Sequence, residues 1–198
     1  MEKVSTDRDD WAVWTADLVT GAPRREGSVR IVAVEGRSGS GKSTVAERLR
    51  AALVARGEPA AVLTMEDLYP GWAGLSRASE LLREWILLPL AAGRPVVWRR
   101  YDWERGGFGP PIPGPPEEVA GGGTLVVEGC GSGTGVVGDL VDVLLWVEAP
   151  ASERERRLAA REDSDLYAPY RGMWARQEED VYAVDPPRDR ADLVVLNL

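Results

Sequence analysis

The sequence has no histidine, a single cysteine, and lysine only at positions 3 and 42. Without histidine, the side chain that titrates nearest neutral pH, any acid–base chemistry falls to carboxylates. The single Cys130 excludes an internal disulfide, so we expect a cytoplasmic location, where thiols stay reduced. Apart from Lys3 and Lys42, every basic side chain is an arginine.

Two further absences concern partners. No apolar run reaches membrane-spanning length, and residues 1–7 lack the charged-then-apolar plan of a signal peptide. The formal net charge of −8 argues against a nucleic-acid scaffold, which usually presents a basic face. We therefore expect partners that are small molecules, with neither a membrane nor a nucleic acid among them. The length of 198 residues suits one domain, or one domain with an appendage.

One motif is specific. Residues 36–43 read G-R-S-G-S-G-K-S, which fits the phosphate-loop pattern G-x-x-x-x-G-K-[ST]. Residues 29–34 before it form a β-branched apolar run typical of a buried parallel strand. Residues 44–53 after it carry apolar side chains at helical spacing. Strand, glycine loop and helix together predict a nucleotide site, because the loop amides and the helix N-terminus attract phosphate.

This motif supplies the predicted nucleotide contacts. Lys42 would reach the β- and γ-phosphates and act in catalysis, and the Ser43 hydroxyl would bind Mg²⁺. The full set of predicted nucleotide-binding residues is Gly36, Ser38, Gly39, Ser40, Gly41, Lys42, Ser43, Thr44 and Arg157.

The pattern along the chain predicts an α/β fold. Short apolar runs at 60–65, 124–129, 141–147 and 191–196 alternate with helical stretches. We expect a P-loop NTPase three-layer sandwich, with about five parallel strands, helices on both faces and a small helical lid over about 154–171. Residues 1–27 read as an N-terminal extension that we expect to be helical, and 28–198 as the P-loop domain. The Pro- and Gly-rich stretch 106–116 reads as a surface loop.

Three carboxylates follow predicted strands. Glu128 ends a buried apolar run, where a metal or a metal-bound water would compensate its charge. Glu66 and Asp67 follow the second strand at the edge where ligands bind in open α/β sheets. On extended backbone two adjacent side chains point in different directions. One of them would be the base for an acceptor hydroxyl, and the other would face the metal shell or solvent. The predicted metal ligands are Ser43, Glu128 and Asp67.

The lid and the aromatic residues complete the candidate site. Arg157 and Arg161 share a helical face with Arg154, and Arg171 lies beyond the next turn. Arginine suits bidentate phosphate contacts, although interleaved glutamates equally fit an exposed charge-paired helix. The predicted acceptor-binding residues are Tyr69, Trp72, Tyr101, Asp102, Trp103 and Arg171, where the alternative is that the rings fill the edge of the core.

Taken together, these residues resemble the uridine kinase-like branch of the P-loop kinases. The similarity rests on four blocks in order: 36–44, Met65-Glu66-Asp67-Leu68-Tyr69, Tyr101-Asp102-Trp103 and Val127-Glu128-Gly129. It implies an ATP- and Mg²⁺-dependent kinase that phosphorylates a hydroxyl of a small, nucleoside-like acceptor. In that family the base is an aspartate at the position of Glu66, with Asp67 beside it here, so the resemblance leaves the base open between the two. It also implies that Arg161 acts in a catalytic lid.

The phosphate loop also fits other acceptors and other functional classes. The acceptor could be a nucleoside monophosphate, a sugar or a pantothenate-like compound. A nucleotide-dependent switch is a different class, but the guanine-reading Asn-Lys-x-Asp signature is absent. A binding protein without turnover is disfavoured by the intact Lys42, Ser43 and Glu128. The sequence does not distinguish ATP from GTP, or a monomer from a homodimer.

Overall fold

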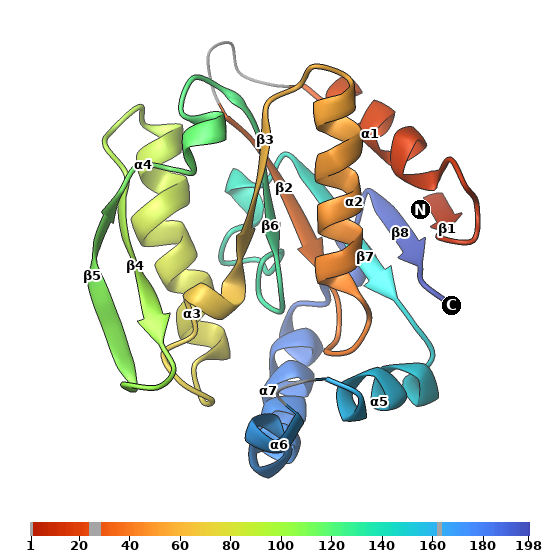
Figure 1. Cartoon of the computed structure of the whole chain (residues 1–198), viewed down its shortest axis with the longest axis vertical. Coiled ribbons are helices and arrows are strands. Elements are labelled where there is room, and N and C mark those ends of the chain that lie inside the picture. Colours follow the sequence, from red (N-terminus) through yellow and green to blue (C-terminus); the bar gives the residue numbers. More distant parts are fainter. Residues whose placement is uncertain (1, 24–28, 162–163) are drawn as a thin grey trace.

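The computed structural model describes residues 2–23, 29–161 and 164–198. Its centre is a six-stranded parallel sheet with the order β1-β8-β7-β2-β6-β3 (Figure 1). The predicted α/β class is therefore confirmed. The strands are β1 (Glu2–Ser5), β2 (Val29–Glu35), β3 (Ala60–Thr64), β6 (Gly123–Glu128), β7 (Val143–Glu148) and β8 (Leu193–Leu196).

The sheet has one strand more than predicted, and the extra strand is β1. It pairs in parallel with β8, with Val4 opposite Val195. Its four residues are mostly polar and exposed, so periodicity does not reveal it. The helix expected in the N-terminal extension is α1 (Trp11–Gly21). The extension thus adds an edge strand to the main sheet, and the boundary predicted at residues 27 and 28 lies outside the described residues.

Helices cover both faces of the sheet, because alternate residues along its strands point apolar side chains to opposite faces. Val32 and Val34 of β2 pack with α1 and α2 (Lys42–Ala55). On the opposite face, Ile31 packs with α3 (Leu75–Leu82) and the π-helical turn Arg83–Leu87, which continues into α4 (Leu88–Ala91). The same face carries α7 (Arg171–Val184), whose Tyr182 packs near Ala33. These are the three layers that the sequence predicts.

The Pro- and Gly-rich stretch is not simply a loop. Gly107–Pro113 forms β5, which pairs antiparallel with β4 (Val97–Asp102) in a separate two-stranded sheet. Proline lacks an amide donor, but a strand with one partner needs only one bonded edge. The prediction of a loop was therefore wrong for these residues, although none of them is buried, as expected of a surface segment.

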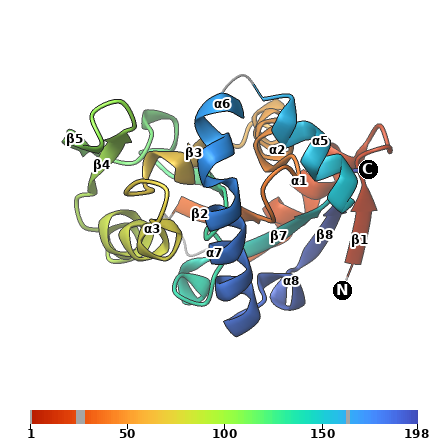
Figure 2. The same ribbon diagram turned by 90° about the horizontal axis from the view of Figure 1, so that it is seen from below.

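The segment predicted as a lid lies at the carboxyl ends of the parallel strands (Figure 1). It contains α5 (Ala151–Ala159), α6 (Ser164–Tyr167) and a 3-10 turn at Ala168–Tyr170, while residues 162–163 lie outside the described chain. Figure 2, viewed from this edge, shows α6 and α7 between α3 and α5. Short 3-10 turns at Met65–Asp67, Glu117–Val119 and Gly138–Leu140 and the short α8 (Pro187–Arg190) complete the fold. Among the described residues, no helix is long and apolar enough to cross a bilayer.

Candidate active site

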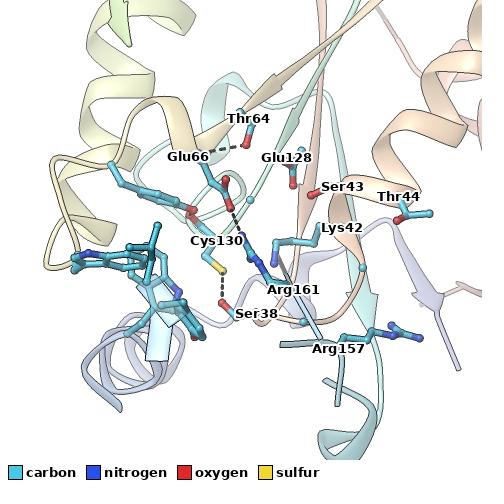
Figure 3. Close-up of a pocket in the computed structure, with 18 of the residues that line it drawn as sticks. Ser38, Lys42, Ser43, Thr44, Thr64, Glu66, Glu128, Cys130, Arg157 and Arg161 are labelled. Carbon is cyan, nitrogen blue, oxygen red and sulfur yellow. Dashed lines mark hydrogen bonds and ion pairs between the residues drawn. The ribbon is translucent and has the colours of Figure 1, made fainter. Parts of the chain in front are cut away.

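A cavity of about 650 Å³ lies between the phosphate loop, the end of β3 and the lid segment (Figure 3). This is within the usual size range of small-molecule sites. Most of the predicted residues line it: Ser38, Gly39, Gly41, Lys42, Ser43, Thr44, Glu66, Tyr69, Trp72, Trp103, Glu128, Arg157 and Arg161. Predicted residues that are not part of its lining are Gly36, Ser40, Asp67, Tyr101, Asp102 and Arg171.

The phosphate loop joins the end of β2 to the start of α2. Gly39 has a φ of +78°, and a Cβ there would lie 2.5 Å from the Arg154 carbonyl oxygen, so both backbone angle and space require glycine. Gly41, at a φ of 93°, is the N-cap of α2, and no side chain of the described residues caps this helix. The amides of its first turn are thereby left for a ligand, and the helix dipole adds positive potential there.

Lys42 begins α2 and is buried at the floor of the cavity. Its ammonium donates a hydrogen bond to the Arg37 carbonyl oxygen at 3.1 Å. Burial alone lowers the pKa of Lys42, but Cys130 and the carboxylates of Glu178 and Glu128 outweigh it, so the net pKa is raised. The ammonium thus remains charged in a desolvated position, where its attraction for phosphate is least screened.

Ser43 and Glu128 fit a magnesium site. Glu128 is the last residue of β6 and is buried. It faces the hydroxyl of Ser43, which lies in the first turn of α2 (Figure 3). Burial raises the pKa of Glu128, and Lys42 and the hydroxyls of Thr64 and Ser43 oppose that rise. Within the described parts of the chain, no three His, Cys, Asp or Glu side chains form a metal cluster. One carboxylate and one hydroxyl agree with Mg²⁺, which takes much of its shell from water and nucleotide phosphate.

Glu66 and Asp67 both lie in the 3-10 turn Met65–Asp67, and only Glu66 lines the cavity. The Thr64 hydroxyl accepts a hydrogen bond from the Glu66 amide at 3.3 Å, which starts the turn. The Glu66 carboxylate lies 3.4 Å from the Arg161 guanidinium. Asp67 instead forms an ion pair with Arg100 of β4 at 3.0 Å. The structure thus places Asp67 at the hairpin, and it does not support the predicted metal role of Asp67.

Two arginines of α5 hold the phosphate loop. Arg154 donates to the Ser38 carbonyl oxygen at 3.2 Å, and Arg157 donates to the Ser40 carbonyl oxygen at 3.2 Å. Arg157 also lines the cavity and forms an ion pair with Glu153 at 2.6 Å. The helix is therefore both charge-paired and attached to the loop. Arg171 lies apart, 3.9 Å from Glu155, which does not support its predicted contact with the acceptor.

The predicted acceptor-binding residues 69–103 also divide into those that line the cavity and those that do not. Tyr69, Trp72 and Trp103 line the cavity, whereas Tyr101 packs edge-on against Trp103 from behind it. Asp102 accepts hydrogen bonds from the amides of residues 104 and 105, at 3.1 and 3.0 Å. Its carboxylate therefore caps the turn of the β4–β5 hairpin. The expectation that Asp102 binds an acceptor hydroxyl is not supported, because aspartate in this position stabilises a turn.

Several site residues escaped prediction. Glu178 of α7 is buried and contacts the phosphate loop, and Glu35 at the end of β2 accepts hydrogen bonds from the Gly131 and Gly133 amides at 2.8 and 2.9 Å. Burial raises the pKa of Glu35 despite these donors. Glu178 lies in a run of charged residues with no motif around it. The cavity-lining residues that the sequence analysis did not assign are Thr64, Gly129, Cys130, Leu166, Tyr167 and Trp174.

The parallel sheet, with the phosphate loop after its central strand β2, is a fold shared with two solved structures that are described as kinases. A possible uridine kinase from Bacillus stearothermophilus superposes with a TM-score of 0.64 at 18% identity, covering 94% of this chain and 97% of that one. A protein from Silicibacter sp. TM1040, provisionally assigned as a fructose transport system kinase, gives a TM-score of 0.65 at 24% identity, covering 92% and 97%.

These neighbours confirm the predicted resemblance to the uridine kinase-like branch at the level of the fold. Both similarities extend over almost the whole of either chain. No protein-family model and no curated protein matches the sequence.

Proposed function

We propose that this protein is an ATP- and Mg²⁺-dependent phosphotransferase that moves the γ-phosphate to a hydroxyl of a small-molecule acceptor. The observation that carries the proposal is that one cavity holds Lys42, the Ser43–Glu128 pair and Glu66 (Figure 3). A phosphate cradle, a metal position and a candidate base are the parts that phosphoryl transfer requires.

The loop amides and the Lys42 ammonium would bind the β- and γ-phosphates. Both are fixed before a ligand arrives, because Gly39 lies against α5 and Lys42 is hydrogen-bonded to the loop itself. A preorganised set of donors can stabilise the charge that develops on the transferred phosphoryl group. Arg157 would extend this positive surface, since it also lines the cavity.

Ser43 and Glu128 would hold Mg²⁺, which supplies neutralisation of phosphate charge when it is bound. Ionised Glu128 is costly in its buried position, as its raised pKa shows, and a cation at this position would remove that cost. The residues present therefore fit the metal that the fold implies.

Glu66 would accept the proton of the acceptor hydroxyl. Its carboxylate lines the cavity and remains largely exposed, so it can reach a bound alcohol. Arg161 would steady this carboxylate through their ion pair and add positive charge on the lid side. The two structural neighbours agree with this reaction class, since both are described as kinases.

The direct test is acceptor-dependent release of ADP from ATP and Mg²⁺. The panel contains uridine, cytidine, UMP, fructose and pantothenate, each measured against an acceptor-free blank. Stimulation by an alcohol, with formation of its phosphate ester, supports the proposal. A rate that no acceptor changes would favour a nucleotide-dependent switch instead.

A further inference from the structure

The cavity has an aromatic end opposite the charged end. Five rings line it, and we call them the aromatic wall: Tyr69, Trp72, Trp103, Tyr167 and Trp174. Trp72 contacts Trp103 and Tyr167 at centroid distances of 4.7 and 5.8 Å, and Tyr69 meets Trp174 edge-on at 4.7 Å. These rings come from separate parts of the chain, and the fold brings both groups of rings to one cavity.

Three of the five rings of this wall already use their polar atoms within the protein. The Tyr69 hydroxyl donates to the Cys130 carbonyl oxygen at 2.9 Å. The Trp103 indole N–H donates to the Glu66 carbonyl oxygen at 3.2 Å. The Trp174 indole N–H donates to the buried Glu178 carboxylate at 3.1 Å. A ligand that enters this end therefore meets carbon surface at these three rings.

The charged groups lie at the other end. Lys42 and Glu128 belong to the phosphate and metal side (Figure 3). Glu66 adjoins the aromatic wall, since its carbonyl oxygen accepts a hydrogen bond from Trp103, and its carboxylate pairs with Arg161. The lining is thus polar where a hydroxyl would react and apolar where the rest of the acceptor would lie.

We propose that the acceptor is an alcohol whose body is a flat, weakly polar aromatic ring, recognised by carbon contacts and not by hydrogen bonds to the ring edge. This inference rests on the proposed function, and it names the substrate class of the same site. A sugar would bury several hydroxyls against the wall, and a nucleobase would bury its polar edge. Both would lose hydrogen bonds to water without replacement, which a site of this kind penalises.

The test compares alcohols that differ in one property at a time. Benzyl alcohol and cyclohexylmethanol have similar size, but only the first is flat and aromatic. 2-Naphthalenemethanol enlarges the ring, and uridine and fructose supply the polar alternatives. With ATP and Mg²⁺, we expect kcat/KM for 2-naphthalenemethanol to exceed that for uridine and fructose at least tenfold, and benzyl alcohol to exceed cyclohexylmethanol. A higher kcat/KM for uridine or fructose would overturn this inference while leaving the kinase function intact.

Variants of Trp103 test whether the aromatic wall binds the acceptor. Trp103 is 39% exposed, so its replacement does not open the core. We expect Trp103→Leu to raise the KM for 2-naphthalenemethanol at least tenfold with little change in the KM for ATP, and Trp103→Phe to restore most of it. Trp85 packs edge-on against Phe108 outside the cavity lining, so Trp85→Leu is the matched control. Equal effects of Trp103→Leu and Trp85→Leu would contradict the inference.

Calorimetric binding separates this inference from the proposed function. If no alcohol stimulates ADP release but 2-naphthalenemethanol binds the wild type and not Trp103→Leu, the kinase function fails and recognition by the aromatic wall stands. If 2-naphthalenemethanol neither binds nor reacts, the inference is overturned.

Discussion

The buried carboxylate of Glu178 accepts two hydrogen bonds from Ser38, one from its backbone amide at 2.9 Å and one from its hydroxyl at 2.5 Å. The same oxygen accepts from the Trp174 indole N–H at 3.1 Å. Ser38 belongs to the phosphate loop, and Trp174 belongs to the aromatic wall. One carboxylate on α7 therefore links both ends of the cavity.

Replacement of Glu178 by glutamine should weaken nucleotide binding. The amide oxygen can still accept, but hydrogen bonds to a charged acceptor are roughly twice as strong as neutral ones. We expect the Kd for a non-hydrolysable ATP analogue to rise about tenfold, equivalent to about 1.4 kcal/mol. Titration calorimetry measures it. Glu179→Gln, one residue away on the exposed face of α7, should have no effect, and an equal effect of both variants would refute the role of Glu178.

Lys42→Ala should strongly reduce phosphoryl transfer and leave the fold intact. The ammonium is the single lysine charge in the cavity, and loss of one preorganised donor costs about 10²–10³ in turnover. The readouts are acceptor-dependent ADP release and the thermal midpoint of unfolding. Lys3→Ala, at the exposed edge strand β1, is the control. Full activity in Lys42→Ala would mean that the ammonium has no catalytic part.

Glu66 and Asp67 should differ strongly despite their adjacency. Glu66 lines the cavity, whereas Asp67 is paired with Arg100, so Glu66→Gln should lower kcat by about 10²–10⁴, the usual contribution of a general base. Asp67→Asn should change kcat only slightly. Both are measured at saturating ATP and acceptor. A larger loss in the Asp67 variant would reverse the assignment.

The ion pairs of Glu153 should make a contribution to the thermal stability of the protein that is lost at acid pH. Hydrogen bonds from Arg156 and also from Arg157 lower the pKa of Glu153 to about 2. A carboxyl with a lowered pKa stabilises the fold above its unfolded pKa of about 4.5 and loses that contribution as the pH falls toward its folded pKa. The difference in thermal midpoint between the wild type and Glu153→Gln should therefore be constant from pH 7 to pH 5 and should narrow below about pH 4.5.

A control on the same helix isolates this effect. Glu155 lies 3.9 Å from Arg171 and is largely exposed, so Glu155→Gln should show little difference at any pH, as is common for surface pairs. A gap between the wild type and Glu153→Gln that widens on acidification would contradict the expected sign.

Sequence patterns predicted the elements of this fold that are determined by residues close together in the chain. The phosphate loop was predictable because glycine spacing, the lysine and the flanking strand and helix lie within 25 consecutive residues, 29–53. The buried strands β2, β6 and β7 were predictable because each is a continuous apolar run. β1 and β5 were not, since the first is polar and the second contains prolines, and each depends on a partner strand for its structure.

The site shows the same division. Glu128 ends a strand that the apolar run predicts, so its position at the cavity could be predicted. The choice between Glu66 and Asp67 depended on a 3-10 turn and on Arg100 of a hairpin that the pattern did not reveal. Asp102 appeared to suit an acceptor because its aromatic neighbours do, but its carboxylate caps a turn. Glu178 acts through a contact between residues 140 positions apart in the chain, which no local pattern encodes.

A crystal structure with Mg²⁺ and a non-hydrolysable ATP analogue tests the central claim most directly. The account predicts the β- and γ-phosphates on the amides at the start of α2 and on the Lys42 ammonium, with Mg²⁺ bound by Ser43 and near Glu128. A structure in which the analogue binds elsewhere, or in which the loop is filled by side chains of the protein at saturating analogue, would contradict it.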